Sequence, residues 1–237
     1  MSPAGPPNGE LDLTDDVPGA FADAVCRAFA ERPAERFLLF LSGGPTARRC
    51  YERLAARSSP DGAAGPGPVD WKLVDVCMSD ERCVPPDDAD ANQRLVREAL
   101  LERVGPVGSF RPMSCEDGAG AYEQVLASMP APDLIHLGLG ADGHSASLFP
   151  GSDALESPGD KLVVLSRDPQ GRNAHDRMTL TLRAIARARL VLFTVAGEDK
   201  ADALRAVCSG QDVPAARVRA QRVRWLVDRT TLGVAVG

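Results

Sequence analysis

Short runs of consecutive apolar residues recur along the chain and constrain its fold more than any other feature. Phe37–Leu41 and Leu190–Val195 contain no charged residue, and Asp133–Leu139 is nearly as apolar. Runs of this length indicate strands that are buried on both faces, which is typical of parallel sheets covered by helices. The sequence therefore predicts an α/β protein.

Segments with helical periodicity separate the apolar runs. In residues 17–30, for example, Val17, Phe21, Val25 and Phe29 recur every four residues and would share one helix face. Further helices are expected over residues 47–56, 92–104, 119–129, 184–188 and 200–207, and further strands over residues 71–78, 161–165, 178–182, 223–227 and 232–236. This alternation predicts a mostly parallel sheet flanked by helices.

The domain organisation follows from the absence of repeats and linkers. The sequence shows no internal repeat and no clean linker, although residues 58–68 are rich in Gly and Pro and predict a loop. We therefore expect a disordered leader over residues 1–16 and a single-domain fold over residues 17–237.

Composition limits the partners and the location. With 44% apolar and 25% charged residues, the chain has the make-up of a soluble globular protein. Its net charge of −6 argues against nucleic acid as the main partner, although a local group of Arg and Lys could still bind a small anion. The N-terminus lacks the features of a signal peptide, and no apolar run is long enough to span a membrane. We expect a cytoplasmic protein.

The six cysteines form no C-x-x-C pair, and their spacing from the histidines matches no zinc pattern. We therefore expect no metal site. Several of the cysteines fall within predicted strands and helices, so we expect reduced thiols that pack as small apolar groups, in keeping with a reducing compartment.

The most informative motif is G-L-G-A-D-G-H-S-A-S-L-F-P-G-S, from Gly138 to Ser152, at the end of the strand over Asp133–Leu139. Its glycines allow a close approach of the backbone to a ligand. Asp142 and His144 lie two residues apart on this turn and could act as an acid/base pair. The alternative is a tight turn that carries a surface histidine.

Three other strand ends carry residues suited to an anionic ligand. Ser42-Gly43-Gly44-Pro45-Thr46 leads into a helix, whose N-terminal N–H groups can bind a phosphate. Ser79–Arg82 places three charges after a strand, and Lys200 opposes the dipole of the helix that follows Gly197 unless it meets an anion. The alternatives are a plain turn, a solvated rim and a surface lysine. Because carboxyl ends of parallel strands share one edge, together these motifs suggest an enzyme acting on a small phosphorylated substrate.

Five motifs, in order, resemble those of the 6-phosphogluconolactonases, in the glucosamine/galactosamine-6-phosphate isomerase-like family. They are S-G-G-P-T at Ser42, W-x(8)-D-E-R-C-V-P at Trp71, the Gly138 motif, R-M-T-L-T at Arg177 and G-E-D-K at Gly197. The resemblance implies a NagB/RpiA-like, Rossmann-type topology. It also implies hydrolysis of 6-phospho-D-glucono-1,5-lactone to 6-phosphogluconate, in the oxidative pentose phosphate pathway, without a cofactor.

We assign roles to the motif residues on this basis. His144 is expected to be the catalytic base and acid, assisted by Asp142. The substrate, a phosphorylated sugar lactone, is expected to contact Gly43, Gly44, Thr46, Asp80, Arg82, Asn92, Arg177 and Lys200. Of the other histidines, His136 lies within a strand and is expected to be structural, and His175 to be solvated. A monomer or weak homodimer is expected.

The chain departs from the family pattern in several places. Pro45 and Ala47 replace the Ser and the Pro of the usual S-G-G-S-T-P, and Pro45 removes one N–H donor. Ala91 stands where the family has Ser, and R-D-P-Q-G-R-N-A-H-D-R replaces a proline-rich approach to Arg177. Arg82, Arg167 and Arg177 therefore all remain candidates for the phosphate contact.

Two alternatives differ in specific residues. In glucosamine-6-phosphate deaminases the motif resembles D-G-H-I-A-F-N-E-P, with a glutamate five residues after the histidine; here Phe149 stands at that position, and Arg82 replaces a tyrosine. A sugar-phosphate-binding regulator on the same fold would carry a DNA-binding region before the first helix, where about 16 residues are found. Both comparisons favour the lactonase.

Overall fold

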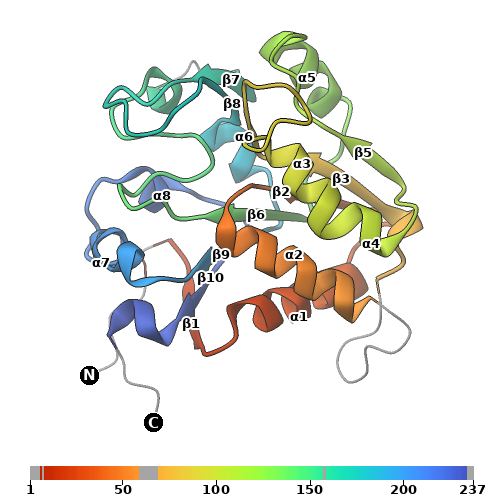
Figure 1. Ribbon diagram of the computed structural model, residues 1–237, viewed down its shortest axis with the longest axis horizontal. Coiled ribbons are helices and arrows are strands. Elements are labelled where there is room, and N and C mark those ends of the chain that lie inside the picture. Colours follow the sequence, from red (N-terminus) through yellow and green to blue (C-terminus); the bar gives the residue numbers. More distant parts are fainter. Residues whose placement is uncertain (1–5, 7, 59–68, 157–158, 234–237) are drawn as a thin grey trace.

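The computed structural model describes residues 6, 8–58, 69–156 and 159–233, and it is built around a seven-stranded parallel sheet (Figure 1). In spatial order the strands are β1 (Glu10–Thr14), β10 (Arg222–Asp228), β9 (Leu190–Val195), β6 (Leu134–Gly138), β2 (Phe37–Leu41), β3 (Val74–Met78) and β5 (Ser109–Arg111). Every neighbouring pair is parallel, which confirms the predicted mostly parallel sheet.

Helices cover the sheet, and α1 (Val17–Ala30) and α2 (Pro45–Arg57) pack together on one side of it (Figure 1). Helix α1 begins where the Asp16 carboxylate accepts the Gly19 N–H, and it buries the predicted apolar face. The other helical segments are η1 (Trp71–Leu73), α3 (Asn92–Val96), η2 (Arg97–Leu101), α4 (Glu102–Val104), α5 (Gly118–Ala127), η3 (Asp153–Glu156), α6 (Leu182–Ala186), η4 (Glu198–Lys200), α7 (Ala201–Cys208), α8 (Pro214–Arg217) and η5 (Arg229–Leu232). The predicted helix over 92–104 is confirmed, with a π-helical segment, η2, in its middle.

A second, antiparallel sheet of three short strands lies beyond the main one. It consists of β4 (Asp80–Arg82), β8 (Arg177–Leu180) and β7 (Val163–Ser166), with β8 in the centre. Apolar patterning located β7 and β8, but β4 was predicted only as a charged strand end. The register places Arg82 directly opposite Arg177, so this small sheet brings together two separate sequence motifs.

The predicted disordered leader over residues 1–16 is wrong for residues 10–14, which form β1 at the edge of the main sheet. Leu11 and Leu13 alternate with polar residues and pack against the core, as expected for an edge strand with one covered face. Arg224 of β10 pairs with Asp12 at 2.6 Å. The folded unit therefore begins before residue 17.

Other boundaries differ locally. The strand expected over 71–78 begins only at Val74, because the Asp70 carboxylate accepts the Lys72 N–H and caps η1 instead. Leu232 ends η5, and residues 234–236 of the expected last strand lie outside the described residues, as do residues 59–68 of the expected loop.

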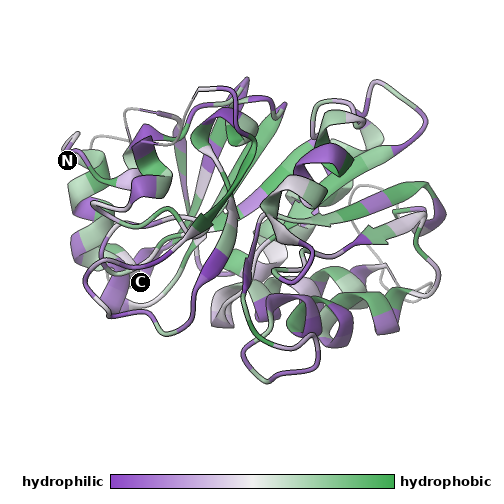
Figure 2. Ribbon diagram, turned by 90° about the horizontal axis from the view of Figure 1, so that it is seen from above, coloured by the Kyte–Doolittle hydropathy of each residue, from purple (hydrophilic) through white to green (hydrophobic). Residues whose placement is uncertain are grey.

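The core is a continuous set of apolar side chains between the sheet and its helices, visible as hydrophobic central strands in Figure 2. His136 is fully buried in β6, which confirms its structural assignment. Burial lowers the pKa of His136 to about 3, so its ring is neutral. None of the helices in the described part of the chain is long and apolar enough to span a membrane.

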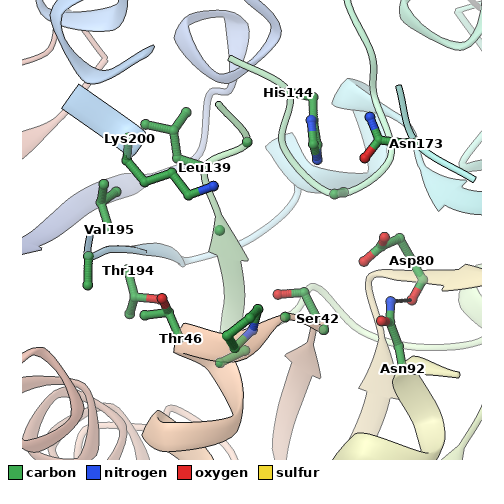
Figure 3. A pocket seen from close by; sticks show the side chains of 18 of the residues that line it. Ser42, Thr46, Asp80, Asn92, Leu139, His144, Asn173, Thr194, Val195 and Lys200 are labelled. Carbon is green, nitrogen blue, oxygen red and sulfur yellow. Dashed lines mark hydrogen bonds between the residues drawn. The ribbon is translucent and has the colours of Figure 1, made fainter. Parts of the chain in front are cut away.

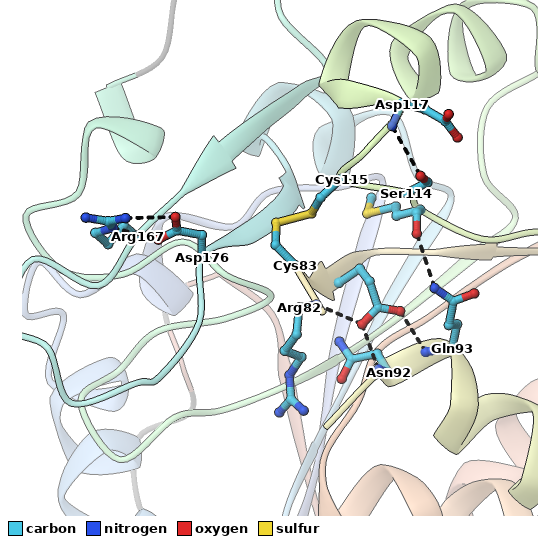
Figure 4. The surroundings of a disulfide bond; sticks show 11 residues. Arg82, Cys83, Asn92, Gln93, Ser114, Cys115, Asp117, Arg167 and Asp176 are labelled. Carbon is cyan, nitrogen blue, oxygen red and sulfur yellow. Dashed lines mark hydrogen bonds and ion pairs between the residues drawn. A yellow bond between two sulfur atoms is a disulfide. The ribbon is translucent and has the colours of Figure 1, made fainter. Parts of the chain in front are cut away.

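The prediction that all six cysteines are reduced is wrong for two of them. Cys83 and Cys115 form a disulfide that joins the end of β4 to the segment between β5 and α5 (Figure 4). Their Cα atoms lie 5.4 Å apart although 32 positions separate them in sequence, so no local spacing indicated the pair. Cys26, Cys50, Cys77 and Cys208 are free thiols, as predicted.

We predict that replacing both Cys83 and Cys115 by Ser lowers the free energy of unfolding by about 3–4 kcal/mol, since a closed loop of this length restricts the unfolded chain. Urea denaturation of the oxidised protein measures the change, and a reductant should shift the parent protein similarly. Cys208→Ser, which removes a free thiol, is the control and should cost less than about 1 kcal/mol. Equal midpoints for all samples would contradict a stabilising disulfide.

Candidate functional site

A cavity of about 290 Å³ opens at the carboxyl ends of β2, β6 and β9, where ligands bind in open α/β sheets. Nine of the ten residues predicted to act at the site line it: Gly43, Gly44, Thr46, Asp80, Arg82, Asn92, His144, Arg177 and Lys200. In Figure 3, Lys200 reaches in from one side, while Asp80 and Asn92 face it from another. Asp142, the tenth, lies behind His144 and does not line the cavity.

His144 has one ring nitrogen engaged and one left for a ligand. Its Nδ1 lies 2.5 Å from Asp142 Oδ1, and the same oxygen accepts the His144 backbone N–H at 3.1 Å. Nε2 has no hydrogen-bond partner within the described residues. The ring packs against Phe149 with centroids 4.9 Å apart, and a Cβ on Gly140 would lie 2.1 Å from Nδ1, so the motif leaves just enough room for this imidazole.

The Asp142 carboxylate is held on both oxygens. Oδ1 contacts His144, and Oδ2 accepts a hydrogen bond from Arg172 Nη2 at 2.9 Å. Burial raises the pKa of Asp142, but the hydrogen bonds and charge of His144, together with the charge of Arg172, outweigh it and bring the pKa to about 2. Asp142 is therefore an anion at neutral pH and can orient the imidazole through Nδ1.

The N-terminus of α2 forms one wall of the cavity. No side chain caps this helix, so its first N–H groups are left for water or a ligand. Pro45 occupies the first helical position, where an N–H would have no partner within the helix, and Thr46 follows it in the wall. A Cβ on Gly43 would lie 1.8 Å from Asn92 Oδ1, so only glycine fits between this loop and α3.

Three cations face the cavity despite the net charge of −6: Arg82, Arg177 and Lys200. Arg177 is 8% exposed, and its burial, together with the neighbouring Arg82, lowers the pKa of its guanidinium. Lys200 Nζ pairs with Asp199 at 2.9 Å. Two arginines held side by side at a cavity favour an anionic ligand.

Arg167, the third arginine considered for the phosphate contact, does not line the cavity. Its guanidinium pairs with Asp176 at 2.6 and 2.8 Å, and its side chain is 77% exposed. Arg82 and Arg177 are the two of the three candidates that the fold brings to the site.

Asn92 is held beside the cavity by the carboxylate of Glu81, which the sequence analysis treated only as one of three charges after a strand. Glu81 is buried and accepts the backbone N–H groups of Arg82, Asn92 and Gln93 at 2.6–2.7 Å, which joins β4 to the start of α3 (Figure 4). Burial raises the pKa of Glu81 and the three N–H groups lower it, with a net pKa of about 7. Asp80 accepts a hydrogen bond from Ser147 at 2.7 Å, and Asn92 Nδ2 donates to the Asp80 carbonyl at 3.0 Å.

The segment between β7 and β8 supplies residues that the sequence reasoning missed. Asn173 lines the cavity, and Arg172 contacts Asp142. In the sequence, the only indication that this stretch contributes to the site was its departure from the family pattern. His175, predicted to be solvated, is partly exposed and lies 3.0 Å from Asp90. Thr194, near the end of β9, also lines the cavity. The sequence analysis did not predict this, because it noted Thr194 only as part of an apolar run.

Most of the chain is similar to known proteins. Residues 10–227 match the family model described as glucosamine-6-phosphate isomerases/6-phosphogluconolactonase. The chain is 37% identical to a 6-phosphogluconolactonase of Synechocystis sp. over 224 residues, which cover 86% of each chain. It is 38% identical to a 6-phosphogluconolactonase of Mycobacterium tuberculosis over 214 residues, or 81% of this chain and 82% of that one.

A solved structure of similar shape is the 6-phosphogluconolactonase of Thermotoga maritima. It has a TM-score of 0.77 and 30% sequence identity, and the match covers 93% of this chain and 99% of that one. With most of its length matched in sequence and in fold, this chain belongs to the glucosamine-6-phosphate isomerase/6-phosphogluconolactonase family.

Proposed function

We propose that this protein hydrolyses 6-phospho-D-glucono-1,5-lactone to 6-phosphogluconate, a step of the oxidative pentose phosphate pathway. The observation that carries the proposal is a histidine with one nitrogen bound to an anionic carboxylate and the other free, in a cavity that also holds three cations. The curated relatives named 6-phosphogluconolactonase support the choice of substrate.

The proposed reaction needs one group that accepts and then donates a proton. The neutral His144 Nε2 takes a proton from water as its oxygen bonds to the lactone carbonyl carbon. The resulting oxyanion is stabilised by Arg82 or by loop N–H groups. When the bond from that carbon to the ring oxygen breaks, His144 returns the proton to the ring oxygen, and Asp142 stabilises the intermediate imidazolium. The proposed steps require no cofactor.

Substrate binding divides between the two sides of the cavity. We propose that Gly43, Gly44, Thr46 and Lys200, with Arg177, hold the phosphate, because the uncapped α2 N-terminus and the cations favour a dianion. Asp80 and Asn92 would bind sugar hydroxyls. Asn173 joins them, since its Nδ2 is bound to Asp168 and its Oδ1 remains an acceptor.

Phe149 favours the lactonase over the deaminase. It occupies the position at which the deaminase motif has a glutamate, and it is buried against the His144 ring. An apolar ring there cannot supply a carboxylate for opening an amino sugar.

We also propose that the protein works in the cytoplasm, as a monomer or weak homodimer that binds no nucleic acid. Four of the six cysteines are free thiols, which suits a reducing compartment, whereas the Cys83–Cys115 disulfide points the other way. Among the described residues, Leu165 is the one large apolar side chain that is exposed, so the described surface offers little area for an obligate interface.

The assay that tests the function follows acid release from freshly made 6-phosphogluconolactone, with the spontaneous rate subtracted. We expect strong acceleration, and no ammonia from glucosamine 6-phosphate, because the site lacks the deaminase glutamate. Ammonia release at a comparable rate would reassign the enzyme, and inactivity on both substrates would refute the proposal.

We predict that His144→Ala lowers kcat by about 10²–10⁴-fold, the usual contribution of a general acid/base. The thermal unfolding midpoint should change little, because the side chain borders a cavity rather than the core. Steady-state kinetics and thermal denaturation measure the two effects. A folded variant with near-normal turnover would remove His144 from the mechanism.

We predict that Lys200→Ala raises KM for the phosphorylated lactone about tenfold to a hundredfold, because a charge-assisted contact to the phosphate is lost. Gluconolactone without the phosphate should be turned over as before, however slowly. Lys161→Ala, which removes an exposed lysine outside the cavity, is the matched control. Equal losses on both lactones would mean that Lys200 supports the fold or the chemistry, and would leave Arg177 as the cation that holds the phosphate.

A further inference from the structure

The Asp142 carboxylate lies between two partners, and the mechanism above uses only one of them. Its Oδ1 meets His144 Nδ1 at 2.5 Å, while its Oδ2 meets Arg172 Nη2 at 2.9 Å. Arg172 is not among the residues that line the cavity. Its contact with the active site runs through Asp142.

Arg172 is presented by a segment that a buried carboxylate holds in place. The Asp168 side chain is fully buried and accepts the backbone N–H groups of Gln170, Arg172 and Asn173 at 2.9–3.0 Å. It also lies 3.9 Å from Arg172 Nε. These hydrogen bonds fix the backbone at residue 172, and the Arg172 side chain extends from this fixed position to Asp142.

We propose that Arg172 is a positioning residue for the His144–Asp142 pair: it holds the carboxylate that orients the imidazole, and it offsets the negative charge of that carboxylate. The proposal rests on the proposed function, in which His144 is the general base. It assigns a role to the stretch in which this chain departs from the family pattern.

The charges around His144 give the direction of the effect. Asp142, on the same turn, favours the imidazolium, and Arg172, from the segment between β7 and β8, opposes it. The apolar Phe149 packs on the ring, and Val213, before α8, lies close to Gly143. The other charged side chains that line the cavity are Asp80 and Arg82 of β4, Arg177 of β8 and Lys200 of η4. Replacing Arg172 alone leaves Asp142 uncompensated, and His144 then binds its proton more tightly.

The test is the pH dependence of kcat/KM for Arg172→Met. We expect the acidic limb, where activity rises as the general base loses its proton, to move to higher pH by about 0.5–1 unit. The loss of activity should therefore be larger at pH 6 than at pH 8. Arg172→Lys keeps the charge and should keep the limb near its original position.

Arg167→Met is the matched control. It also removes an arginine–carboxylate pair from the segment between β7 and β8, but that pair lies outside the cavity. Its acidic limb should not move. An Arg172→Met profile that falls equally at every pH, or that matches the parent protein, would overturn the proposal.

A second readout separates this proposal from the proposed function. The chain has three histidines, so NMR titration of the His144 ring can be followed whether or not the protein is active. The Arg172→Met titration should move to higher pH, and the Arg167→Met titration should not. An unchanged His144 titration overturns the role of Arg172, whereas a shifted titration in a protein without lactonase activity supports it and refutes the function.

Discussion

One buried chain of hydrogen bonds joins the three strands whose ends build the cavity. The Tyr51 hydroxyl, from α2, contacts the Ser42 N–H and carbonyl after β2 at 3.0 and 2.8 Å, and His136 Nδ1 of β6 at 2.8 Å. His136 Nε2 contacts Thr194 Oγ1 of β9 at 2.8 Å. A neutral ring protonated on Nδ1 satisfies these contacts together, and burial keeps the ring neutral. The relative placement of the loop that begins at Ser42, the central strand and Thr194 depends on these hydrogen bonds.

The cavity concentrates charge and unpaired polar groups that are costly elsewhere in the fold. Ser42 Oγ, Arg82 Nε, Asn92 Oδ1 and Arg177 Nε are buried and have no hydrogen-bond partner within the described residues. Arg82 and Arg177 also repel each other across β4 and β8. Rigid support makes the arrangement possible, because Glu81 ties β4 to α3 and the Cys83–Cys115 disulfide holds the end of β4. Donors held in place before a ligand arrives need little reorganisation to stabilise developing negative charge.

Local patterns along the chain were enough to predict the class of fold and the strand ends that border the cavity, and the family resemblance added Asn92 and Arg177. Continuous apolar runs are typical of strands buried on both faces in a covered parallel sheet, so Phe37–Leu41 and Leu190–Val195 indicated strands near its centre. Parallel strands end at one edge, so motifs that follow different strands meet there. The sequence therefore predicted that Gly43, His144 and Lys200 lie close together, and all three line the cavity.

The contacts between residues far apart in sequence depended instead on the packing of the whole fold. The Cys83–Cys115 pair, the Arg82–Arg177 register and the contact of Arg172 with Asp142 each join segments whose approach depends on how loops and the small sheet pack. No period or motif encodes such distances. The same holds for β1, whose short alternation of apolar and polar residues becomes a strand only because β10 offers it an edge to pair with. Local chemistry was therefore readable from the sequence, whereas the partners that orient and tune it depend on packing.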